Sequence, residues 1–420
     1  MKFRITCLAA ALFFATVSLT FGNGLSLNSI GPKSLGMGGA FIGLADDYTA
    51  VYWNPAGITN LDKIQIAAFV TDVIPSSTYK YVLADNTVIA DAKSKPNHYI
   101  SPNIAGYIPL MKGDLVVGLG AYVPAGLGTE WDGNELKVLS NQKSYVWKTK
   151  IAVFDISPVI AYKINDMFSV GASLDIHYGM FDLERYAQPA QYTESSTGIG
   201  IGGSLGILVK PDKLLNIGLS FKTENNIKFE GTAKNPAMQA VNVPESEFSR
   251  DVAWPMWFGG GIAFFPIENL TLAFDVQYSM WSNTEDSLIT DYKSPQWKGA
   301  IGKDTVMHLD WKDAMQIRFG AQYDLSNEFA IRLGYYYDPA PAPDNTLNIL
   351  FPSITYNALT LGASYKLTSQ FNIDFGAEYL MGTERVIAAP KTGDPNFHAM
   401  PGTHNTNIIA VSLGLCMTLD

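Results

Sequence analysis

Most of this sequence alternates between large apolar residues and small or polar ones, and this period of two restricts its possible folds more than any other feature. The segment 271–281 is representative, because every second residue is large and apolar, and these residues share one face. That face consists of Leu272, Phe274, Val276, Tyr278 and Met280. Successive side chains of a β-strand point to opposite faces, so the segment is predicted to be a strand with one apolar face.

Fourteen segments with this pattern are predicted to be strands. They are 63–73, 98–110, 115–123, 148–163, 167–181, 197–210, 214–224, 252–265, 270–282, 312–324, 328–338, 354–367, 371–382 and 405–419. Six short connections alternate strictly with seven long ones between these segments. Short turns at one end and long loops at the other are typical of bacterial outer-membrane barrels. We therefore predict an all-β fold, a transmembrane antiparallel β-barrel over residues 63–420.

A soluble β-sandwich is the alternative fold for such a pattern. Many of the predicted strands have at least ten residues, whereas strands of globular proteins usually have about 5–6. A transmembrane strand needs about 9–11 residues. Charged residues make up only 16% of the chain, compared with roughly 25% in soluble domains. Strand length and composition both favour a barrel with apolar side chains toward lipid and polar ones toward the lumen.

The N-terminus has the features of a secretory signal peptide over residues 1–22. Lys2 and Arg4 precede an apolar run that ends at small residues near Gly22. An uncleaved membrane anchor is the alternative, but the run is near the lower length limit for a spanning helix. Cleavage would leave Cys416 as the only cysteine, so no internal disulfide is expected. With 29 basic and 39 acidic residues, the chain is not expected to bind nucleic acid.

Residues 23–62 do not alternate and are rich in glycine. A phosphate-binding loop is not indicated, because no strand, loop and helix surround these glycines. Asp46 or Asp47 is predicted to cap a short helix from Tyr48 to Trp53, which Pro55 then ends. Side chains alone do not fill the lumen of a fourteen-stranded barrel. We therefore predict that this segment is a compact hatch that plugs the lumen; a periplasmic tail is the alternative.

Three stretches resemble the FadL/TodX family of outer-membrane transporters. Residues 45–57, with Ala-Asp-Asp followed by Asn54-Pro55-Ala56, resemble the hatch motif of that family. Residues 332–343 resemble its run of arginine, glycine, aspartate and prolines, and residues 272–282 are similar to another family strand. The chain departs from the family at Ala125, where an aromatic residue is usual, at Ser353, and at its non-aromatic C-terminus.

The resemblance implies transport of hydrophobic small molecules, either long-chain fatty acids or aromatic hydrocarbons, without a cofactor. Implied partners are the ligand, outer-membrane lipid and lipopolysaccharide, and the barrel-assembly machinery. The candidate residues are Asn54, Pro55 and Ala56 for the hatch; Met37, Phe41, Ile42, Tyr52 and Trp53 for an apolar pocket; Lys312, Arg318 and Arg332 for a ligand carboxylate; and Gly118, Gly120 and Pro124 for a lateral opening in the third strand.

Each candidate group also has a purely structural interpretation. The hatch residues could form only a packed core, the arginines could pair with Asp275, Asp374 and Glu378, and the third strand could hold a simple bulge. Arg318 and Arg332 are expected to be diagonal neighbours across a hairpin.

No enzyme is predicted, because the five histidines are scattered without metal-ligand spacing and no nucleophile elbow is present. An adhesin or receptor acting through its long loops is the alternative function.

Overall fold

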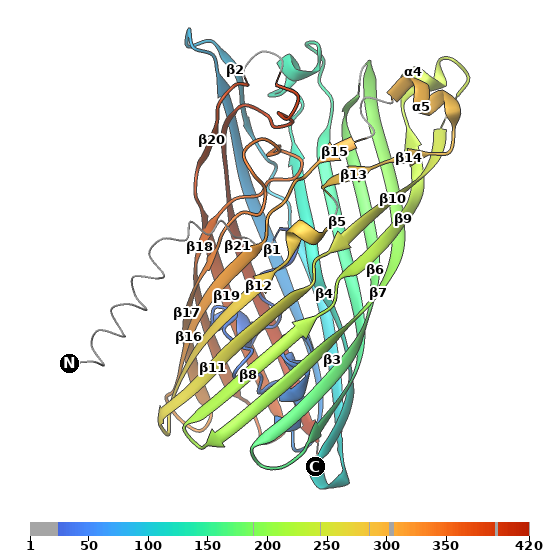
Figure 1. The fold of residues 1–420 in the computed structure, drawn as a ribbon. Helices are drawn as coiled ribbons and strands as arrows, with labels where there is room; N and C mark the ends of the chain where they lie inside the picture. The colour runs from blue at the N-terminus through green and yellow to red at the C-terminus, as the bar shows by residue number, and fades with distance from the viewer. Residues whose placement is uncertain are drawn as a thin grey trace, which may run out of the picture.

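The computed structural model describes residues 24–419 except 188, 244, 285, 302–305 and 391–393. The predicted signal peptide lies outside the described residues. The described chain forms a tall closed β-barrel with short turns at one end and long loops at the other (Figure 1). In the described ranges, no helix combines the length and the apolar character needed to cross a membrane.

Fourteen antiparallel wall strands are present in the described part of the chain, and two of them are interrupted. In chain order the wall is formed by β1 (Ile64–Val82), β3 (Tyr99–Leu110), β4 (Leu115–Trp131), β5 (Trp147–Lys163), β6 (Phe168–Ala187), β7 (Ala190–Asp212), β8 (Leu215–Lys222) with β9 (Asn225–Lys234), β10 (Glu245–Trp254) with β11 (Trp257–Ile267), β12 (Leu270–Ser279), β16 (Ala314–Asp324), β17 (Phe329–Asp338), β18 (Tyr356–Lys366), β19 (Phe371–Gly382) and β21 (Gly402–Leu419). Pairing of β1 with β21, from Ile64↔Leu419 to Lys80↔Thr403, closes the barrel.

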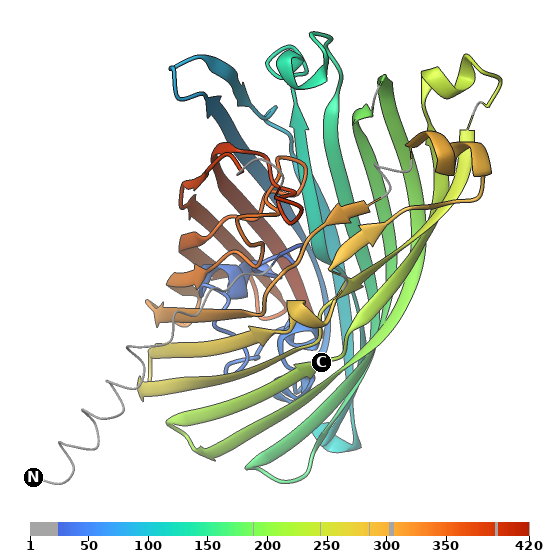
Figure 2. The same ribbon diagram turned by 45° about the horizontal axis from the view of Figure 1, so that its top comes forward.

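Smaller elements lie in the loops and inside the barrel. The loop elements are β2 (Val88–Lys93), β13 (Ser287–Ile289), β14 (Asp291–Tyr292), β15 (Val306–His308), β20 (Arg385–Ile387), α4 (Pro236–Gln239), α5 (Pro295–Ile301), η2 (Met111–Gly113), η3 (Lys137–Ser140) and η4 (Trp281–Asn283). Inside the barrel are α2 (Pro32–Gly36), α3 (Ala50–Trp53) and η1 (Pro55–Asn60). Figure 2 shows these inner elements within the ring of strands.

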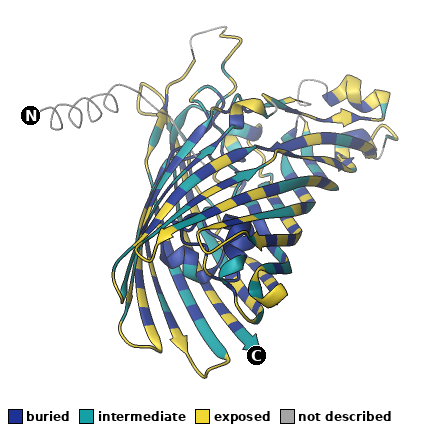
Figure 3. Cartoon of the chain, turned by 60° about the horizontal axis from the view of Figure 1, so that its bottom comes forward, coloured by how far each residue is buried: buried dark blue, intermediate teal, exposed yellow. Residues whose placement is uncertain are grey.

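The burial pattern along the strands between the short turns and the loop-end extensions confirms the barrel and excludes the sandwich. In β12, Asp275, Gln277 and Ser279 are buried, while Leu272 on the opposite face is exposed. Alternating buried and exposed bands run along the strands in Figure 3. A sandwich would bury the apolar face in a shared core. Here the apolar face points outward, as a lipid-facing wall requires.

Several strands extend beyond their predicted ends at the side with the long loops. β1 continues from the predicted residue 73 to Val82, and β9 and β10 lengthen the seventh and eighth strands. In β9, Ile227 and Phe229 are buried while Lys228 and Glu230 are exposed. This is the pattern of a soluble strand, so the extension is not an apolar, lipid-facing surface.

Residues 24–62, called the hatch below, lie inside the end of the barrel with the short turns (Figures 1 and 3). The predicted helix 48–53 is shorter in the structure, where α3 begins at Ala50 and ends at Trp53. Asn54 follows with an extended backbone, φ −159° and ψ 102°, as expected of a residue before proline. The hatch therefore turns away from the helix at the predicted position.

Candidate functional site

Asn54 connects three parts of the structure. Its side-chain oxygen accepts a hydrogen bond from the Ala56 backbone N–H at 3.2 Å, which caps η1. Its side-chain nitrogen donates to the carbonyl oxygens of Ile42, in the hatch, and of Ile207, in β7, both at 3.0 Å. The side chain is fully buried, so loss of these bonds would leave polar groups unpaired. The predicted hatch motif is thus a docking point of hatch on wall.

Glycines of the wall allow the hatch backbone to approach closely. Gly362 in β18 lies against the Cα atom of Gly36, which a Cβ atom at position 362 would meet at 2.9 Å. At Gly171 in β6, the space of a side chain is taken by Pro55. We call the glycines of this kind the glycine belt: Gly171, Gly206, Gly218, Gly261, Gly320, Gly334, Gly362, Gly376 and Gly414. The glycine belt therefore gives the wall a surface that matches the hatch in one docked position.

A buried carboxylate fixes the hatch turn after α2. In this turn, the backbone N–H groups of Phe41 and Ile42 both donate to the same side-chain oxygen of Asp275 at 2.6 Å. Asp275 is in β12 and is fully buried. Hydrogen bonds to a charged acceptor are stronger than those between neutral groups. The wall therefore holds this turn by a specific polar contact in addition to packing.

Arg318 and Arg332 occupy different places in the lumen, and the prediction that they are diagonal neighbours is wrong. Arg318 lies opposite Tyr336 in the β16–β17 register, and Arg332 lies opposite Gln322. The pair Gly320↔Gly334 lies between them. The expected alternation was correct, but the hairpin turn places the two arginines four residues apart along the pair of strands.

Each arginine is already engaged by protein groups. Arg318 donates to the backbone oxygen of Asn28 at 2.7 Å, and its guanidinium lies 5.4 Å from the ring centre of Trp53. Arg332 donates to Gln322 at 2.7 Å and lies 3.9 Å from Asp374. Lys312 is exposed outside β16. Arg318 therefore joins hatch and wall, whereas Arg332 connects β17 to β16 and β19 within the wall.

The third wall strand, β4, is irregular at Val123 and Pro124. Its register with β5 shifts between Tyr122 and Ala125, and its pairing with β3 ends at Ile104↔Ala121. Gly118 and Gly120 lie in the regularly paired part of the strand, where Gly118 makes room for the Tyr107 ring. Of the three predicted residues, only Pro124 lies at the irregularity.

The first residues of the hatch take the place of β3 beside the irregular part of β4. We call residues 24–29 the strap. Leu27 N–H donates to the carbonyl oxygen of Pro124 at 2.9 Å, and Gly126 N–H donates to that of Leu25 at 3.0 Å. Ser26 and Ala125 form an isolated antiparallel bridge. Backbone groups that β3 leaves without partners are thus bound by the strap.

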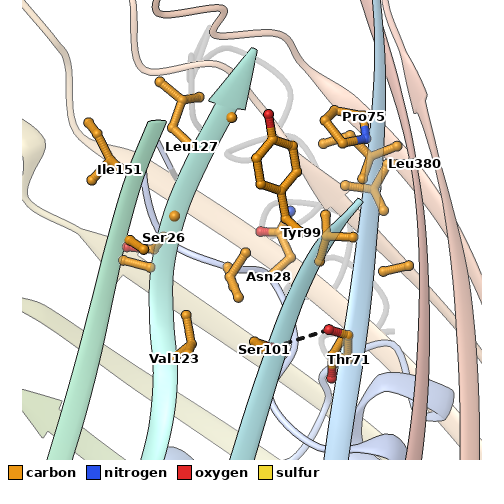
Figure 4. Close-up of a pocket in the computed structure, with 18 of the residues that line it drawn as sticks. Ser26, Asn28, Thr71, Pro75, Tyr99, Ser101, Val123, Leu127, Ile151 and Leu380 are labelled. Atoms are coloured by element: carbon orange, nitrogen blue, oxygen red, sulfur yellow. Dashed lines mark hydrogen bonds between the residues drawn. The ribbon is translucent and has the colours of Figure 1, made fainter. Parts of the chain in front are cut away.

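A cavity of about 530 Å³ extends from this gap into the lumen. Its apolar lining includes Ile100, Val123, Leu127, Ile151, Phe154, Ile354, Leu380 and Ile408, and its polar lining includes Ser26, Asn28, Ser29, Tyr356, Asp338 and Glu378. In Figure 4, Tyr99 stands in the space beside β4, with Leu127 and Ile151 across from it. The Tyr99 ring occupies the space of a side chain at Gly128. The cavity size is within the range of small-molecule sites.

None of the eight residues predicted to bind a ligand lines this cavity. Met37, Phe41, Ile42, Tyr52 and Trp53 are at most 5% exposed and form the packed core between hatch and wall. Sequence reasoning missed Tyr99, Leu127 and Ile151. Pro124 was the available signal, because a strand that departs from its neighbour there opens the space that these side chains border.

A second buried cluster lies at the end of the barrel with the long loops, where the extended strands β7 and β10 meet. The Arg250 guanidinium pairs with the Glu194 carboxylate, and its Nη2 donates to Oε2 at 3.0 Å. Further along the loops, the imidazole rings of His308 and His398 are stacked with their centres 3.5 Å apart. Burial, together with the nearby His398, lowers the pKa of His308. Within the residues that the structure describes, no group of three or more His, Cys, Asp or Glu side chains is arranged to bind a metal.

Comparison with known proteins identifies the family. The family model described as "Outer membrane protein transport protein (OMPP1/FadL/TodX)" matches residues 13–418. The chain belongs to this family. The FadL/TodX family consists of outer-membrane transport proteins, so this member is an outer-membrane transport protein and not an enzyme. These relationships do not favour the alternative of an adhesin or receptor.

Relatives of this FadL/TodX member cover nearly its whole length. The long-chain fatty acid transport protein of Escherichia coli O6:H1 is 25% identical, over 91% of this chain and 92% of the relative. A FadL homologue of Pseudomonas aeruginosa has a similar structure, with a TM-score of 0.77, 15% identity, and coverage of 94% and 99% of the two chains. The toluene transporter TodX of Pseudomonas putida gives a TM-score of 0.71, 18% identity and the same coverage.

Proposed function

We propose that this protein carries hydrophobic small molecules across the outer membrane by facilitated diffusion, with the hatch closing the direct path and the ligand leaving sideways. The observation that carries the proposal is the cavity, which connects the lumen to the gap between β3 and β4. Because the hatch occupies the lumen below this cavity, the gap is the shorter way out for an apolar ligand.

The chemistry of an outer membrane makes a side exit sufficient for such a ligand. The main barrier to an apolar molecule is the polar lipopolysaccharide layer, whereas the hydrocarbon core accepts it readily. A channel therefore has only to carry the molecule past that layer and release it. We propose lipopolysaccharide and membrane lipid as the surroundings of the wall, and the barrel-assembly machinery as a partner during biogenesis.

The names of the relatives support two classes of ligand. One relative is a long-chain fatty acid transport protein and another is a toluene transporter. We propose that the ligand here is a molecule of one of these kinds, an acyl chain or an aromatic hydrocarbon. The apolar side chains around the gap, including Leu127 and Ile151, would bind its hydrocarbon part.

Restoring the regular pairing of β4 tests the side exit. Deletion of Val123 together with Pro124→Val removes the extra residue of the bulge and supplies an amide that can pair. Cells that depend on this protein should then take up labelled oleate or toluene at a much lower rate, with the amount of protein at the surface unchanged. Leu119→Val, in the regular lipid-facing part of β4, is the matched control.

Normal uptake by the regularised variant would exclude the side exit. Absence of uptake of any hydrophobic compound by the unmodified protein would exclude the transport function in the form proposed.

A further inference from the structure

The gap between β3 and β4 is short along β4. Toward the short turns it ends at the strap, which is bound to the backbone of Pro124 and Gly126. Toward the long loops it ends where the Lys95 N–H donates to the carbonyl oxygen of Glu130 at 2.7 Å. Four residues of a strand span about 13 Å. The gap is therefore limited to the stretch of β4 between Gly126 and Glu130.

The cavity crosses the wall at this stretch. On the inner side it is lined by Leu380, which is buried in the lumen. On the outer side it is lined by Phe154 and Met180, which are each 38% exposed on the lipid-facing surface. Residues 126–128 of β4 line it between these two sides. A ligand that leaves the lumen through the gap therefore passes β4 at residues 126–128.

The ring of Tyr99 covers the middle of this stretch. Tyr99 is the first residue of β3, and its backbone pairs with Val73 in β1. Its side chain extends into the space between β3 and β4 (Figure 4). The ring carbon Cζ and the hydroxyl oxygen occupy the place that a Cβ atom at Gly128 would take. The passage that remains lies between this ring and the strap.

The remaining passage is narrow. From Gly126, where the strap is bound, to Gly128, where the ring lies, two residues of a strand span about 7 Å. Carbon atoms in contact are about 3.5–4.0 Å apart, so one row of carbon atoms between two surfaces needs about 7–8 Å. The passage beside the Tyr99 ring therefore fits a single row of carbon atoms.

We propose that Tyr99 makes the side exit selective for the width of the ligand. Molecules one carbon row thick, either an unbranched acyl chain or a planar ring that moves edge-on, pass the ring, whereas branched or cage-shaped molecules do not. The inference rests on the proposed transport function and specifies the shape of its ligand. Without the ring, the passage would extend over the whole stretch from Gly126 to Glu130, about 13 Å.

The test compares the uptake of three labelled ligands by cells that depend on this protein, with cells that lack it as background. The ligands are dodecanoate, toluene and adamantanecarboxylate, which carries the head group of dodecanoate on a cage of carbon atoms. We expect the cage to enter at least about 10-fold more slowly than dodecanoate, which corresponds to about 1.4 kcal/mol in the barrier. Tyr99→Ala should remove most of this difference by accelerating the entry of the cage.

Two control variants separate the ring from other roles of the residue. Tyr99→Phe keeps the ring, so it should keep the preference for dodecanoate. Tyr162→Ala removes a tyrosine of β5 that is 43% exposed and does not line the cavity, so it should change the uptake of no ligand. The amount of protein at the surface is measured for every variant, and rates are compared per surface molecule.

Gly128→Ala tests the position of the ring independently. A methyl group at residue 128 occupies the place of the Tyr99 ring, which must rotate, and the cavity is the free space beside it. We expect the uptake of dodecanoate to fall in this variant and to recover when Tyr99→Ala is added. Gly106→Ala in β3 is the matched control, since the nearest atom to its Cβ is 3.8 Å away.

Three results would overturn the selection by width while the transport function stands. The first is entry of the cage as fast as dodecanoate through the unmodified protein. The second is an unchanged ratio of the two rates in Tyr99→Ala, and the third is an equal effect of Gly128→Ala with and without the Tyr99 ring. If Tyr99→Ala does not reach the surface, the unmodified protein and the single variant Gly128→Ala still decide. Uptake of neither dodecanoate nor toluene by the unmodified protein would overturn the proposed function itself.

Discussion

Replacement of Gly218 with alanine is expected to loosen the hatch while the barrel stays folded. Gly218 belongs to the glycine belt in β8, and a Cβ atom there would lie 2.6 Å from the carbonyl carbon of Ile42 and 2.9 Å from the Cα atom of Gly43, with the Ile42 oxygen closer still. These are backbone atoms, so no side-chain rotation relieves the contact. The hatch turn has to move.

The size of the effect follows from what this movement breaks. Overpacking of a buried site typically costs about 1–3 kcal/mol. The same turn donates from Phe41 and Ile42 to Asp275 at 2.6 Å, and a buried group left unpaired costs a further 1–3 kcal/mol or so. We expect the docked state of the hatch to lose at least about 2 kcal/mol, which raises the undocked fraction roughly 30-fold.

Two measurements on purified protein test this prediction. Hydrogen exchange of peptides covering residues 38–45 should accelerate, and proteoliposomes should swell faster in small polar solutes as the plug loosens. Heat-modifiable migration on gels should remain, because the wall strands are unchanged. Gly106→Ala in β3 is the control, since the nearest atom to its Cβ is the Gln65 oxygen at 3.8 Å. Exchange and swelling of Gly218→Ala equal to those of the unmodified protein would refute the close fit of hatch and wall.

Three further predictions concern the hatch as a whole and the loops. Deletion of residues 25–59 should leave a folded barrel with faster swelling, since that segment adds no wall strand; unchanged swelling by a folded variant would show that the segment is not a plug. Arg250→Met should destabilise the loop end by about 3–5 kcal/mol in denaturant titration, because Glu194 loses its cation, and a variant as stable as the unmodified protein would contradict this. Because burial and His398 lower the pKa of His308 below its usual 6.5, the folded loops favour the neutral ring. The contact between His308 and His398 is therefore complete above pH 6.5 and weakens as the pH falls below 6.5. Hydrogen exchange of peptides 306–310 and 394–400 should then be faster at pH 5 than at pH 7.5, and His308→Phe should remove this difference. Equal exchange at both pH values in the unmodified protein would exclude the pH dependence.

The fold was predictable from sequence wherever lipid imposes a pattern. The structure has β19 at the predicted residues and begins β4 at the predicted residue, because apolar residues must face outward over the whole membrane thickness. The prediction stopped short where the strands leave the membrane. In β9 the apolar residues Ile227 and Phe229 face inward and Lys228 faces outward, so a template for lipid-facing strands does not detect the extension.

The site was harder to predict than the fold, because it depends on which residues of distant segments lie side by side and not on the alternation within one strand. Asn54 was recognisable from its motif, but its bond to Ile207 joins residues 153 positions apart. Pro124 was recognisable as an unusual residue in a strand, yet the space that it opens is bordered by Tyr99 and Leu127, whose side chains resemble any others in their strands. Arg318 was correctly placed in the lumen on the same face as its neighbour Gln316, while its contact with the Asn28 backbone follows only from the docked hatch.

The glycine belt has a consequence for how the wall acquires its alignment. A slip of one residue between two neighbouring strands turns every side chain of the slipped strand to the opposite face, and a slip of two moves another residue into the place of the glycine. At Gly362, for example, either error would put a side chain where the Cα atom of Gly36 lies. The hatch can therefore dock only when each of these strands has the native register with its neighbours, and a wall assembled out of register cannot bind it.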